Sequence, residues 1–341
     1  MKFVVIGYRN VKNPTGPSNV IDSLLKGLDE IHINYTFINL YSTSFKEKMK
    51  KYYRILSLLF ENNVLVNVHT YGYAIPSLVA LISKVNTHNE YFLTVHGISS
   101  YENSLNNLPT KKEKRVIEKF LYEEIPNIIC VSNYAKDIFL KLFNHPQNVY
   151  VVPNGLAEFC ERYKEKNSMI FVYAGGYAKL KGPFECLIIF KEIYKKFPNA
   201  LLTMCGPIID EELFRKVQEF VVSNNLESNI SIKQKLSKSE LNKIYEESMF
   251  VLAPSAFDTF NMTVLEAMNK GCIPIVSENC GIKDILENEC GIIYKSEKDV
   301  VKQIECIDKH IESKKSFELS LKNTYLDMTK KYLKIMERIN E

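Results

Sequence analysis

Short apolar runs alternate with longer amphipathic segments along most of this chain, and this alternation restricts its fold more than any other feature. In the first half, the runs that we predict as β-strands cover residues 2–6, 35–40, 64–68, 91–95, 128–131 and 149–152. Helical periodicity lies between them, at residues 18–28, 75–83, 111–122 and 134–142. Strands separated by helices predict parallel βαβ units, with a sheet that is covered on both faces.

The same alternation starts again after a break. Pro153-Asn154-Gly155 is a turn signal, and a polar stretch follows it at residues 158–168. Predicted strands then cover residues 170–174, 200–205, 230–233, 250–253 and 273–276, and predicted helices cover 183–196, 211–224, 238–247 and 262–270. The predicted fold class is α/β, with two Rossmann-like parallel-sheet domains that join near residue 160. The order of the strands in each sheet is left open.

The composition is that of a globular chain, and it limits the classes of partner that the chain is expected to bind. The chain has 341 residues, of which 46% are hydrophobic and 25% are charged, and this fits two ordinary domains. Its 44 Lys and Arg against 40 Asp and Glu give a net charge of +4, too small to indicate a nucleic-acid partner. A polyanionic small ligand or an anionic membrane surface remains compatible. The eight cysteines form no C-x-x-C pair, which argues against structural zinc and favours free thiols.

Several classes of protein are excluded by motifs that the sequence lacks. It has no signal peptide and no run of ~18 apolar residues that would span a membrane, so we expect a cytoplasmic protein, with peripheral contact to the inner membrane face left open. There is no G-x-G-x-x-G after a predicted strand, no G-x-x-x-x-G-K-[ST] and no G-x-S-x-G. There is also no Asp-x-Asp pair to hold a divalent ion on a diphosphate. Dinucleotide binding, P-loop chemistry and α/β-hydrolase chemistry are therefore disfavoured.

The most informative segment is residues 250–275, FVLAPSAFDTFNMTVLEAMNKGCIPI. A buried strand is followed by a loop and by a helix that Asn261 can cap. The first amides of that helix, at residues 262–264, would bind an anion such as a phosphate. Asp258 lies on the loop and Glu266 on the helix, so that two carboxylates flank the anion site. Because carboxylates accept paired hydrogen bonds from diols, this arrangement predicts a nucleotide-sugar ligand.

This segment resembles the E-x7-E signature of glycosyltransferase family 4, the group 1 family of retaining glycosyltransferases with the GT-B fold. The family pattern P-S-x-x-E-G-F-G-x-x-x-L-E-A-M-A-x-G-x-P-V-I is matched at Pro254, Ser255, Asp258, Phe260, Leu265, Glu266, Ala267, Met268, Gly271, Pro274 and Ile275. The stretch CGIKDILENECGIIY, from Cys280, is similar to the segment that follows in the family. The resemblance implies a GT-B fold, retention of anomeric configuration, and no metal or separate cofactor.

Weaker matches occur in the family's order over most of the chain. FVYAGGYAKLKG, from Phe171, is similar to the family's strand with its G-R and K-G pairs. LLTMCGP, from Leu201, resembles a glycine-rich strand end, and residues 230–241 resemble the strand that lines the base pocket. In the first half, the family landmarks are matched at Thr15-Gly16, Thr94-Val95-His96-Gly97, Cys130-Val131-Ser132 and Val152-Pro153-Asn154-Gly155.

The resemblance implies a role for each matched residue. We take His96, Lys181, Asp258 and Glu266 as candidate catalytic residues. Glu266 would hold the ribose hydroxyls, Asp258 the hydroxyls of the donor sugar, and Lys181 the diphosphate. His96 would face the transferred sugar from the opposite domain. Further substrate-binding positions are Gly16, where a missing Cβ would let the loop approach the phosphates, and Gly175, Lys235, Leu236, Phe260, Asn261, Met262 and Thr263.

The family resemblance also implies that the two domains bind different substrates. Residues 1–160 would form the acceptor-side domain, residues 161–322 would bind the nucleotide-sugar, and a helix in residues 323–341 would pack back on the first domain. We expect a hexosyltransferase that uses a UDP-sugar, or alternatively GDP-mannose, and a saccharide or lipid-linked acceptor in cell-surface polysaccharide synthesis. A non-hydrolysing nucleotide-sugar epimerase and a non-catalytic nucleotide-sugar binding protein are the alternatives from other classes.

Three positions depart from the family pattern. Asp258 is one methylene shorter than the usual glutamate, and Gln234 stands where a base-pocket glycine is usual. Gly176 replaces an arginine, which removes a positive charge that Lys179 or Arg9 would have to supply.

Two further features have an ordinary structural interpretation beside a functional one. His69 follows a predicted strand as His96 does, and we interpret it as a structural or supporting residue. Residues 46–53 combine lysines with two tyrosines and predict a solvated amphipathic surface. The alternative for that surface is a patch that contacts the acceptor or a membrane.

Overall fold

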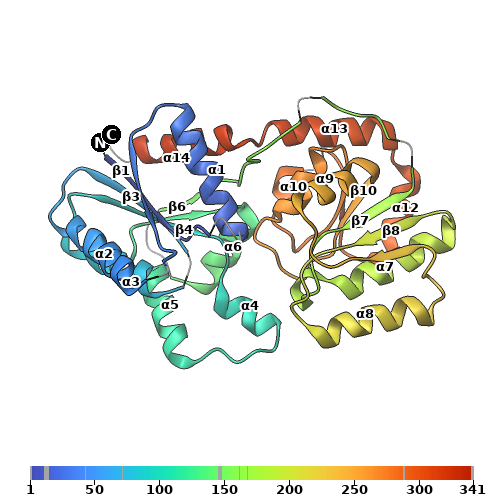
Figure 1. Ribbon diagram of the computed structural model, residues 1–341, viewed down its shortest axis with the longest axis horizontal. Coiled ribbons are helices and arrows are strands. Elements are labelled where there is room, and N and C mark those ends of the chain that lie inside the picture. Colours follow the sequence, from blue (N-terminus) through green and yellow to red (C-terminus); the bar gives the residue numbers. More distant parts are fainter. Residues whose placement is uncertain are drawn as a thin grey trace. The chain divides into compact units, whose positions relative to one another are not determined.

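The computed structural model describes residues 2–10, 15–42, 44–70, 72–144, 148–160, 162–166, 168–286 and 289–338. The chain divides into two compact units (Figure 1). The first unit comprises Met1–Ala157 and Asn323–Glu341, and the second unit comprises Glu158–Lys322. The junction thus lies at Ala157, a few residues before the position expected from the turn signal. Cys160 is tied to the second unit, since its amide donates a hydrogen bond to Asn269 Oδ1 at 2.6 Å.

The first unit is built on a parallel sheet in the order β2-β1-β3-β4-β5-β6. Its strands are β1 (Lys2–Gly7), β2 (Tyr35–Asn39), β3 (Val64–His69), β4 (Glu90–Val95), β5 (Asn127–Cys130) and β6 (Asn148–Val151). Its helices are α1 (Gly16–Glu30), α2 (Phe45–Leu56), the 3₁₀ turn η1 (Ser57–Leu59), α3 (Ala74–Val85), α4 (Ser99–Leu105), α5 (Lys112–Glu124), α6 (Asn133–Leu142) and α14 (Tyr325–Arg338).

The second unit has a parallel sheet in the order β12-β11-β10-β7-β8-β9. Its strands are β7 (Ile170–Tyr173), β8 (Leu201–Met204), β9 (Ile230–Ile232), β10 (Phe250–Ala253), β11 (Ile273–Ser277) and β12 (Ile292–Tyr294). Its helices are the 3₁₀ turn η2 (Lys179–Lys181), α7 (Pro183–Lys196), α8 (Glu211–Ser223), α9 (Lys238–Glu247), α10 (Met262–Met268), α11 (Lys283–Leu286), α12 (Glu297–Cys306) and α13 (Lys309–Leu321).

These two parallel sheets confirm the predicted α/β class with two Rossmann-like halves. The sequence patterns missed α2, α4, β12 and α11 to α13. The reason is clearest for α13, whose buried face is largely serine rather than apolar residues. Ser313 and Ser316 donate hydrogen bonds to the carbonyls of Gly271 and Cys272, at 2.6 and 2.7 Å. A helix that docks through hydroxyls leaves no apolar periodicity to detect.

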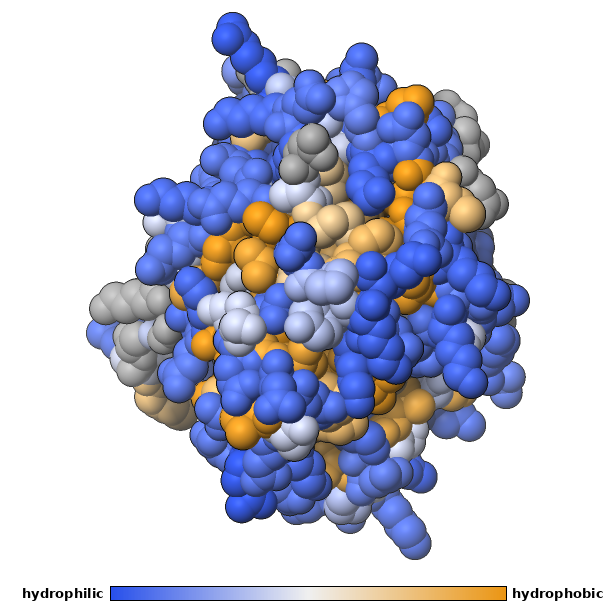
Figure 2. All heavy atoms as spheres, turned by 90° about the vertical axis from the view of Figure 1, so that its right-hand side faces the viewer, coloured by the Kyte–Doolittle hydropathy of each residue, from blue (hydrophilic) through white to orange (hydrophobic). Residues whose placement is uncertain are grey.

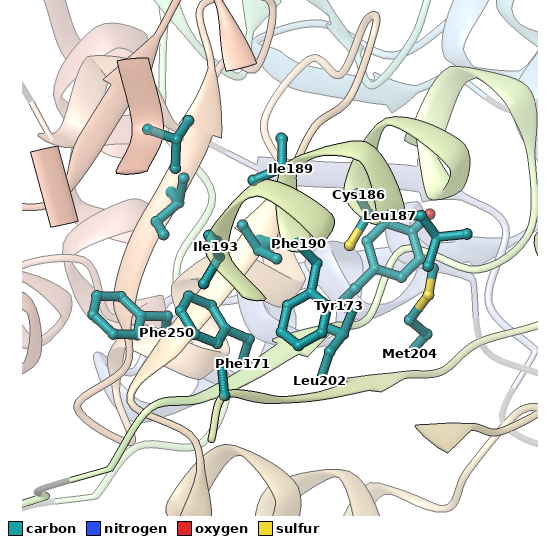
Figure 3. Close-up of a cluster of buried hydrophobic side chains, with 14 of the residues drawn as sticks. Phe171, Tyr173, Cys186, Leu187, Ile189, Phe190, Ile193, Leu202, Met204 and Phe250 are labelled. Carbon is teal, nitrogen blue, oxygen red and sulfur yellow. The ribbon is translucent and has the colours of Figure 1, made fainter. Parts of the chain in front are cut away.

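The core of the second unit lies between its sheet and the helices around it (Figure 3). Phe171 on β7 and Phe250 on β10 stack with ring centroids 4.7 Å apart, because these two strands are neighbours in the sheet. Cys186, Leu187 and Phe190 of α7 are fully buried in the same cluster. Burial of strands on both faces accounts for their almost continuous apolar sequences.

The last helix belongs to the core of the first unit. Met328, Tyr332 and Met336, spaced four residues apart on α14, are buried with residues of α1 and β1. At the contact with α1, a Cβ on Gly27 would lie 2.1 Å from Thr329 Oγ1, so glycine permits the close approach of the two helices.

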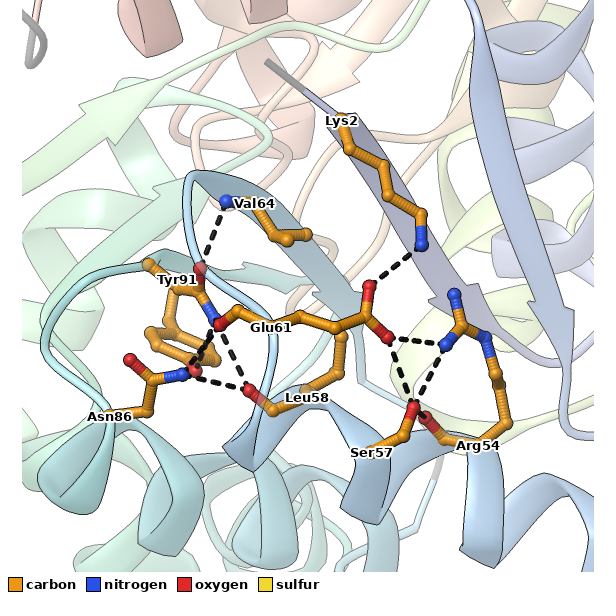
Figure 4. A network of polar contacts seen from close by, with 9 residues as sticks. Lys2, Arg54, Ser57, Leu58, Glu61, Val64, Asn86 and Tyr91 are labelled. Carbon is orange, nitrogen blue, oxygen red and sulfur yellow. Dashed lines mark hydrogen bonds and ion pairs between the residues drawn. The ribbon is translucent and has the colours of Figure 1, made fainter.

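A polar network anchors the amino ends of β1 and β3 (Figure 4). Glu61, just before β3, binds Lys2 at 2.7 Å and also pairs with Arg54. Burial alone would raise the pKa of Glu61, but the hydrogen bonds from Lys2, Arg54 and Ser57 outweigh it and hold that pKa below its ordinary value. This network lies at the edge of the sheet opposite to the carboxyl ends of the strands.

The face shown in Figure 2 is mainly hydrophilic, with hydrophobic side chains in smaller groups between the charged ones. Within the residues that the structure describes, no helix combines the length and the apolar character needed to cross a membrane.

Candidate functional site

The sheet of the second unit has a point at which strand order changes direction, between β7 and β10. From β7 the chain continues through β8 and β9 on one side, whereas β10, β11 and β12 lie on the other. Ligands of open α/β sheets bind outside the carboxyl ends of the strands at such a point, where the following loops diverge. Lys181 follows β7 and Asp258 follows β10, so both candidate residues lie at this point.

The loop after β7 is held in a fixed conformation. The buried phenol of Tyr173 donates hydrogen bonds to the carbonyls of Gly176 and Lys181, at 2.5 and 3.2 Å. Gly182 has a φ of +67°, and a Cβ there would lie 2.1 Å from the carbonyl oxygen of Pro254. Glycine is therefore required for the loop after β7 to approach the loop after β10.

Lys181 and Asp258 form an ion pair across these two loops. Lys181 Nζ lies 2.6 Å from Asp258 Oδ2, and the amide of Phe260 donates to Asp258 Oδ1 at 3.2 Å. The side chain of Asp258 is only 10% exposed, whereas that of Lys181 is 38% exposed. A carboxylate offers about four lone pairs, so Asp258 can accept further hydrogen bonds from a ligand.

The start of α10 differs from the expectation at one position. Asn261, with a φ of +75°, caps the helix, and its Oδ1 accepts hydrogen bonds from the amide of Val264 and from Thr263 Oγ1. The amide of Val264 is therefore already used, and it does not point unpaired into an anion site as the sequence suggested. Met262 and Thr263, which form the first turn, are half-buried.

Glu266 forms a second ion pair, which the sequence did not suggest. Lys238 Nζ, at the start of α9, lies 2.5 Å from Glu266 Oε1. The two residues line a cavity of about 150 Å³, together with Glu158, Phe159, Cys160, Asn242, Asn269 and Lys270. Lys238 lies inside the capping box that Ser237 and Glu240 form, so its sequence signal was that of a helix start. Only the packing of α9 against α10 reveals the pair.

The other predicted positions of this unit differ in exposure. Gly175 is half-buried, and a Cβ there would lie 2.8 Å from the phenol oxygen of Tyr173. Phe260 is buried, Leu236 is half-buried and Lys235 is exposed. Phe260 therefore contributes its backbone amide to this region, as described above, while its ring packs in the interior.

The structure explains why glycine replaces the family arginine at position 176. Gly176 has a φ of +75°, and a Cβ would lie 3.0 Å from both Cδ and the carbonyl oxygen of Pro207. This left-handed, tightly packed backbone disfavours any side chain. Of the two candidate replacements, Lys179 is exposed beside Lys181 in η2, whereas Arg9 forms an ion pair with Asp22 in the first unit.

The first unit holds the remaining predicted residues. Gly16 is the first residue of α1 and is exposed, and a Cβ there would meet no atom within 4 Å, so the unit itself places no steric demand for glycine at that position. His96 directly follows β4, and His69 is the last residue of β3. The two imidazoles are in contact, with His69 Nδ1 2.9 Å from His96 Nε2.

Burial sets the protonation of this histidine pair. Desolvation, followed by the proximity of His96, holds the pKa of His69 well below its ordinary value. Desolvation lowers the pKa of His96 to about 4. Both rings are therefore neutral near pH 7, and each has one donor and one acceptor nitrogen. His69 is fully buried, which agrees with the supporting role that we gave it.

Two family models match the chain and together cover most of it. Residues 158–325 match the model described as glycosyl transferases group 1. Residues 19–157 match the model described as glycosyltransferase family 4. The two matched regions meet at the boundary between the two structural units.

Individual proteins with a similar sequence or fold agree with these models. An uncharacterised glycosyltransferase of Methanocaldococcus jannaschii is 26% identical over 269 residues, covering 72% of this chain and 64% of that protein. A UDP-Gal:alpha-D-GlcNAc-diphosphoundecaprenol alpha-1,3-galactosyltransferase of Escherichia coli is 26% identical over 216 residues, covering 58% of this chain and 53% of that protein. The chain thus spans less than two thirds of the length of these curated relatives.

A solved structure shows the same fold at low sequence identity. The structure of Anabaena HepE in complex with UDP and glucose superposes with a TM-score of 0.73 and 12% identity, covering 98% of this chain and 99% of that one. With the two family models, this match confirms the resemblance stated from the motifs. The chain belongs to the group 1 glycosyltransferases of family 4, and it has the GT-B fold.

Proposed function

We propose that this protein transfers a sugar from a nucleotide-diphosphate donor, preferably a UDP-sugar, to a saccharide or lipid-linked acceptor, with retention of configuration and without a metal ion. One observation supports this proposal above the others. The second unit carries two lysine–carboxylate pairs, Lys181 with Asp258 at the point of reversed strand order and Lys238 with Glu266 between α9 and α10. A nucleotide-sugar offers anions for the lysines and diols for the carboxylates.

The Lys181–Asp258 pair suits the diphosphate and the donor sugar. A phosphate that binds Lys181 gains a cation that Asp258 and the backbone already hold in place, so little reorganisation is needed as negative charge grows on the leaving group. Asp258 keeps lone pairs for hydroxyls of the sugar. Because positive charge is supplied by a side chain, departure of the diphosphate needs no divalent cation.

Glu266 suits the ribose of the nucleotide. Its side chain is 20% exposed and lies beside the cavity described above, so a ribose can reach it from that side. A carboxylate accepts hydrogen bonds from both hydroxyls of a ribose. We assign His96, from the family resemblance, to contact with the transferred sugar.

The preference for UDP rests on similar proteins. The Anabaena HepE structures contain UDP, UDP with glucose, or UDP-glucose, and the name of the E. coli relative specifies UDP-galactose. The latter name also specifies a diphosphoundecaprenol acceptor, which supports a lipid-linked acceptor and a role in cell-surface polysaccharide synthesis.

Helix α2 supports peripheral contact with an anionic membrane face. Phe45, Met49 and Tyr53 are spaced four residues apart on one side of this helix and are 78%, 51% and 78% exposed. Exposed lysines at positions 46, 48 and 50 accompany them. Aromatic and apolar side chains flanked by lysines are typical of helices that lie on an anionic bilayer.

A panel of nucleotide-sugars tests the function. The protein is incubated with UDP- and GDP-sugars, with and without polyprenyl-diphosphate saccharides, and free nucleotide and sugar products are measured. We expect release of UDP that depends on the acceptor and persists in the presence of a chelator. Epimerised sugar without an acceptor would identify an epimerase, and tight UDP binding without turnover would identify a binding protein; either result contradicts the proposal.

A further inference from the structure

We propose that a directed chain of hydrogen bonds inside the first unit fixes the proton of His96 on its Nδ1 atom, and that Asn67 and His69 are the positioning residues that set this direction. The tautomer is independent of the function proposed above, whereas its use at a sugar rests on that function. The amide of Asn67 sets the direction of this chain, because its oxygen only accepts hydrogen bonds and its nitrogen only donates them.

Asn67 is completely buried in β3, and both ends of its amide are engaged. Thr94 Oγ1, on the neighbouring strand β4, donates a hydrogen bond to Asn67 Oδ1 at 2.9 Å. Asn67 Nδ2 lies 3.4 Å from His69 Nε2. An amide nitrogen donates hydrogen bonds and never accepts them, so His69 Nε2 has to be the acceptor.

The protonated nitrogen of His69 in turn determines which nitrogen of His96 is protonated. A neutral His69 that accepts at Nε2 carries its proton on Nδ1, and Nδ1 lies 2.9 Å from His96 Nε2. The ring centroids lie 5.2 Å apart, close to the longest separation that a contact of 2.9 Å between ring nitrogens allows, so the bond lies close to both ring planes. His96 Nε2 therefore accepts, and a neutral His96 carries its proton on Nδ1.

The chain extends in the other direction to the last helix. Tyr332 of α14 is buried, and its Oη lies 3.3 Å from Thr94 Oγ1. Because the proton of Thr94 is directed to Asn67, Tyr332 is the donor in this contact. Each group from Tyr332 to His69 thus donates a hydrogen bond to the next group towards His96. The buried side chains of Thr94, Asn67 and His69 connect Tyr332 of α14 to His96.

The direction decides what His96 can do. A His96 ring with the proton on Nδ1 and an occupied Nε2 can act at Nδ1 only as a hydrogen-bond donor, for which a sugar hydroxyl or a phosphate oxygen is a suitable acceptor. It does not offer a basic nitrogen at Nδ1. In the proposed transferase, His96 would orient the transferred sugar or stabilise charge on it, rather than remove a proton from the acceptor.

Nitrogen NMR of the full-length protein tests the tautomer without any ligand. Protein labelled with ¹⁵N in its histidines is measured near pH 7 by a long-range ¹H–¹⁵N experiment, and the signals are assigned with His69→Gln and His96→Gln variants. We expect a protonated Nδ1 and an unprotonated Nε2 for both His69 and His96. The exposed ring of His88 gives the reference for a tautomeric mixture. A His96 ring protonated on Nε2 would overturn the proposal.

Two variants separate the effect of the Asn67 hydrogen bond on the His96 tautomer from the effect of side-chain packing. Asn67→Leu keeps the volume of the side chain but removes the donor, and we expect the His96 signals to move from the pure Nδ1–H pattern towards the mixture. Tyr332→Phe removes the first hydroxyl but leaves the amide of Asn67, and we expect the pure pattern to remain. An unchanged pattern in Asn67→Leu would show that Asn67 does not set the tautomer. A protein that lacks transferase activity but keeps the Nδ1–H pattern would contradict the proposed function alone.

Discussion

Lys181 Nζ lies 2.6 Å from Asp258 Oδ2, and this contact joins the two loops that leave the second sheet where its strand order reverses. Asp258 is the more buried partner and is also held by the amide of Phe260. The lysine is therefore fixed before a ligand arrives. Such preorganised charge is often the largest contribution that an enzyme makes to stabilising a transition state.

Replacing Lys181 tests this charge. We expect Lys181→Ala to slow nucleotide release from a donor by at least ~10²-fold, the usual scale for losing one preorganised contact to developing charge. Lys195→Ala is the matched control, since Lys195 is an exposed residue of α7 that pairs with Glu192. Steady-state release of nucleotide measures both variants. Equal rates for Lys181→Ala and the control would remove Lys181 from the site.

Replacing Glu266 tests the ribose contact. We expect Glu266→Gln to weaken UDP binding by about tenfold or more, because hydrogen bonds to a charged group contribute about 1.5–3 kcal/mol. Isothermal titration calorimetry with UDP measures the change. Glu219→Gln serves as the control, since Glu219 lies on the exposed face of α8 beside Arg215. Unchanged UDP affinity in Glu266→Gln would contradict the assignment.

The backbone at position 176 gives a prediction about stability. Gly176→Arg forces a side chain onto a left-handed residue that packs on Pro207, and we expect a loss of about 1–2 kcal/mol in the free energy of unfolding. Gly16→Ala is the comparison, because a Cβ at that position meets nothing within 4 Å. Chemical denaturation measures both variants. A Gly176→Arg protein as stable as the unmodified chain would show that the loop adapts without cost.

The histidine pair predicts how stability depends on pH. The pKa of His96 is lowered to about 4 from an ordinary value of 6.5, so between these values the unfolded chain binds more protons than the folded one. The contribution of the neutral histidines to the free energy of unfolding should therefore be fully present above pH 6.5. The free energy of unfolding should fall as the pH decreases towards 4, by up to ~1.4 kcal/mol per pH unit for each such histidine. Urea unfolding across this range measures the slope. His96→Gln should reduce this slope, and an identical slope would contradict desolvation of the neutral ring.

Helix α2 gives a prediction about membranes. We expect the protein to sediment with vesicles that contain phosphatidylglycerol, and less with vesicles of phosphatidylcholine alone. The triple change Phe45→Ser, Met49→Ser and Tyr53→Ser should reduce this binding, because it removes apolar surface that would enter the bilayer interface. Val222→Ser, an exposed apolar position on α8, should leave it unchanged. Equal binding by the triple variant and this control would exclude α2 as the contact.

Much of the fold could be predicted because burial leaves a strong pattern in parallel strands. The run at Phe250–Ala253 is apolar at every position because both faces of β10 are covered, and the predicted and observed bounds agree. By contrast, α13 docks through serine hydroxyls, and β12 is three residues long, so neither produces a detectable period. The strand order also had no local signal, since parallel pairing joins segments far apart in the chain.

The candidate site was predictable only in part, for a similar reason. Asp258, Glu266 and Lys181 could be proposed as candidates from the sequence because each lies within a motif of fixed spacing. Lys238 lies in a helix start without a distinctive motif, and only the packing of α9 and α10 brings it to Glu266. The Asn67–His69 contact follows from two alternate residues on one face of a strand, a spacing that is too common to indicate a function.

The crystal structure of this protein with UDP tests the central claim most directly. We predict that the diphosphate lies within hydrogen-bond distance of Lys181 and that the ribose hydroxyls contact Glu266, with density for UDP outside the carboxyl ends of β7 and β10. A nucleotide bound elsewhere, with the Lys181–Asp258 and Lys238–Glu266 pairs untouched, would contradict it.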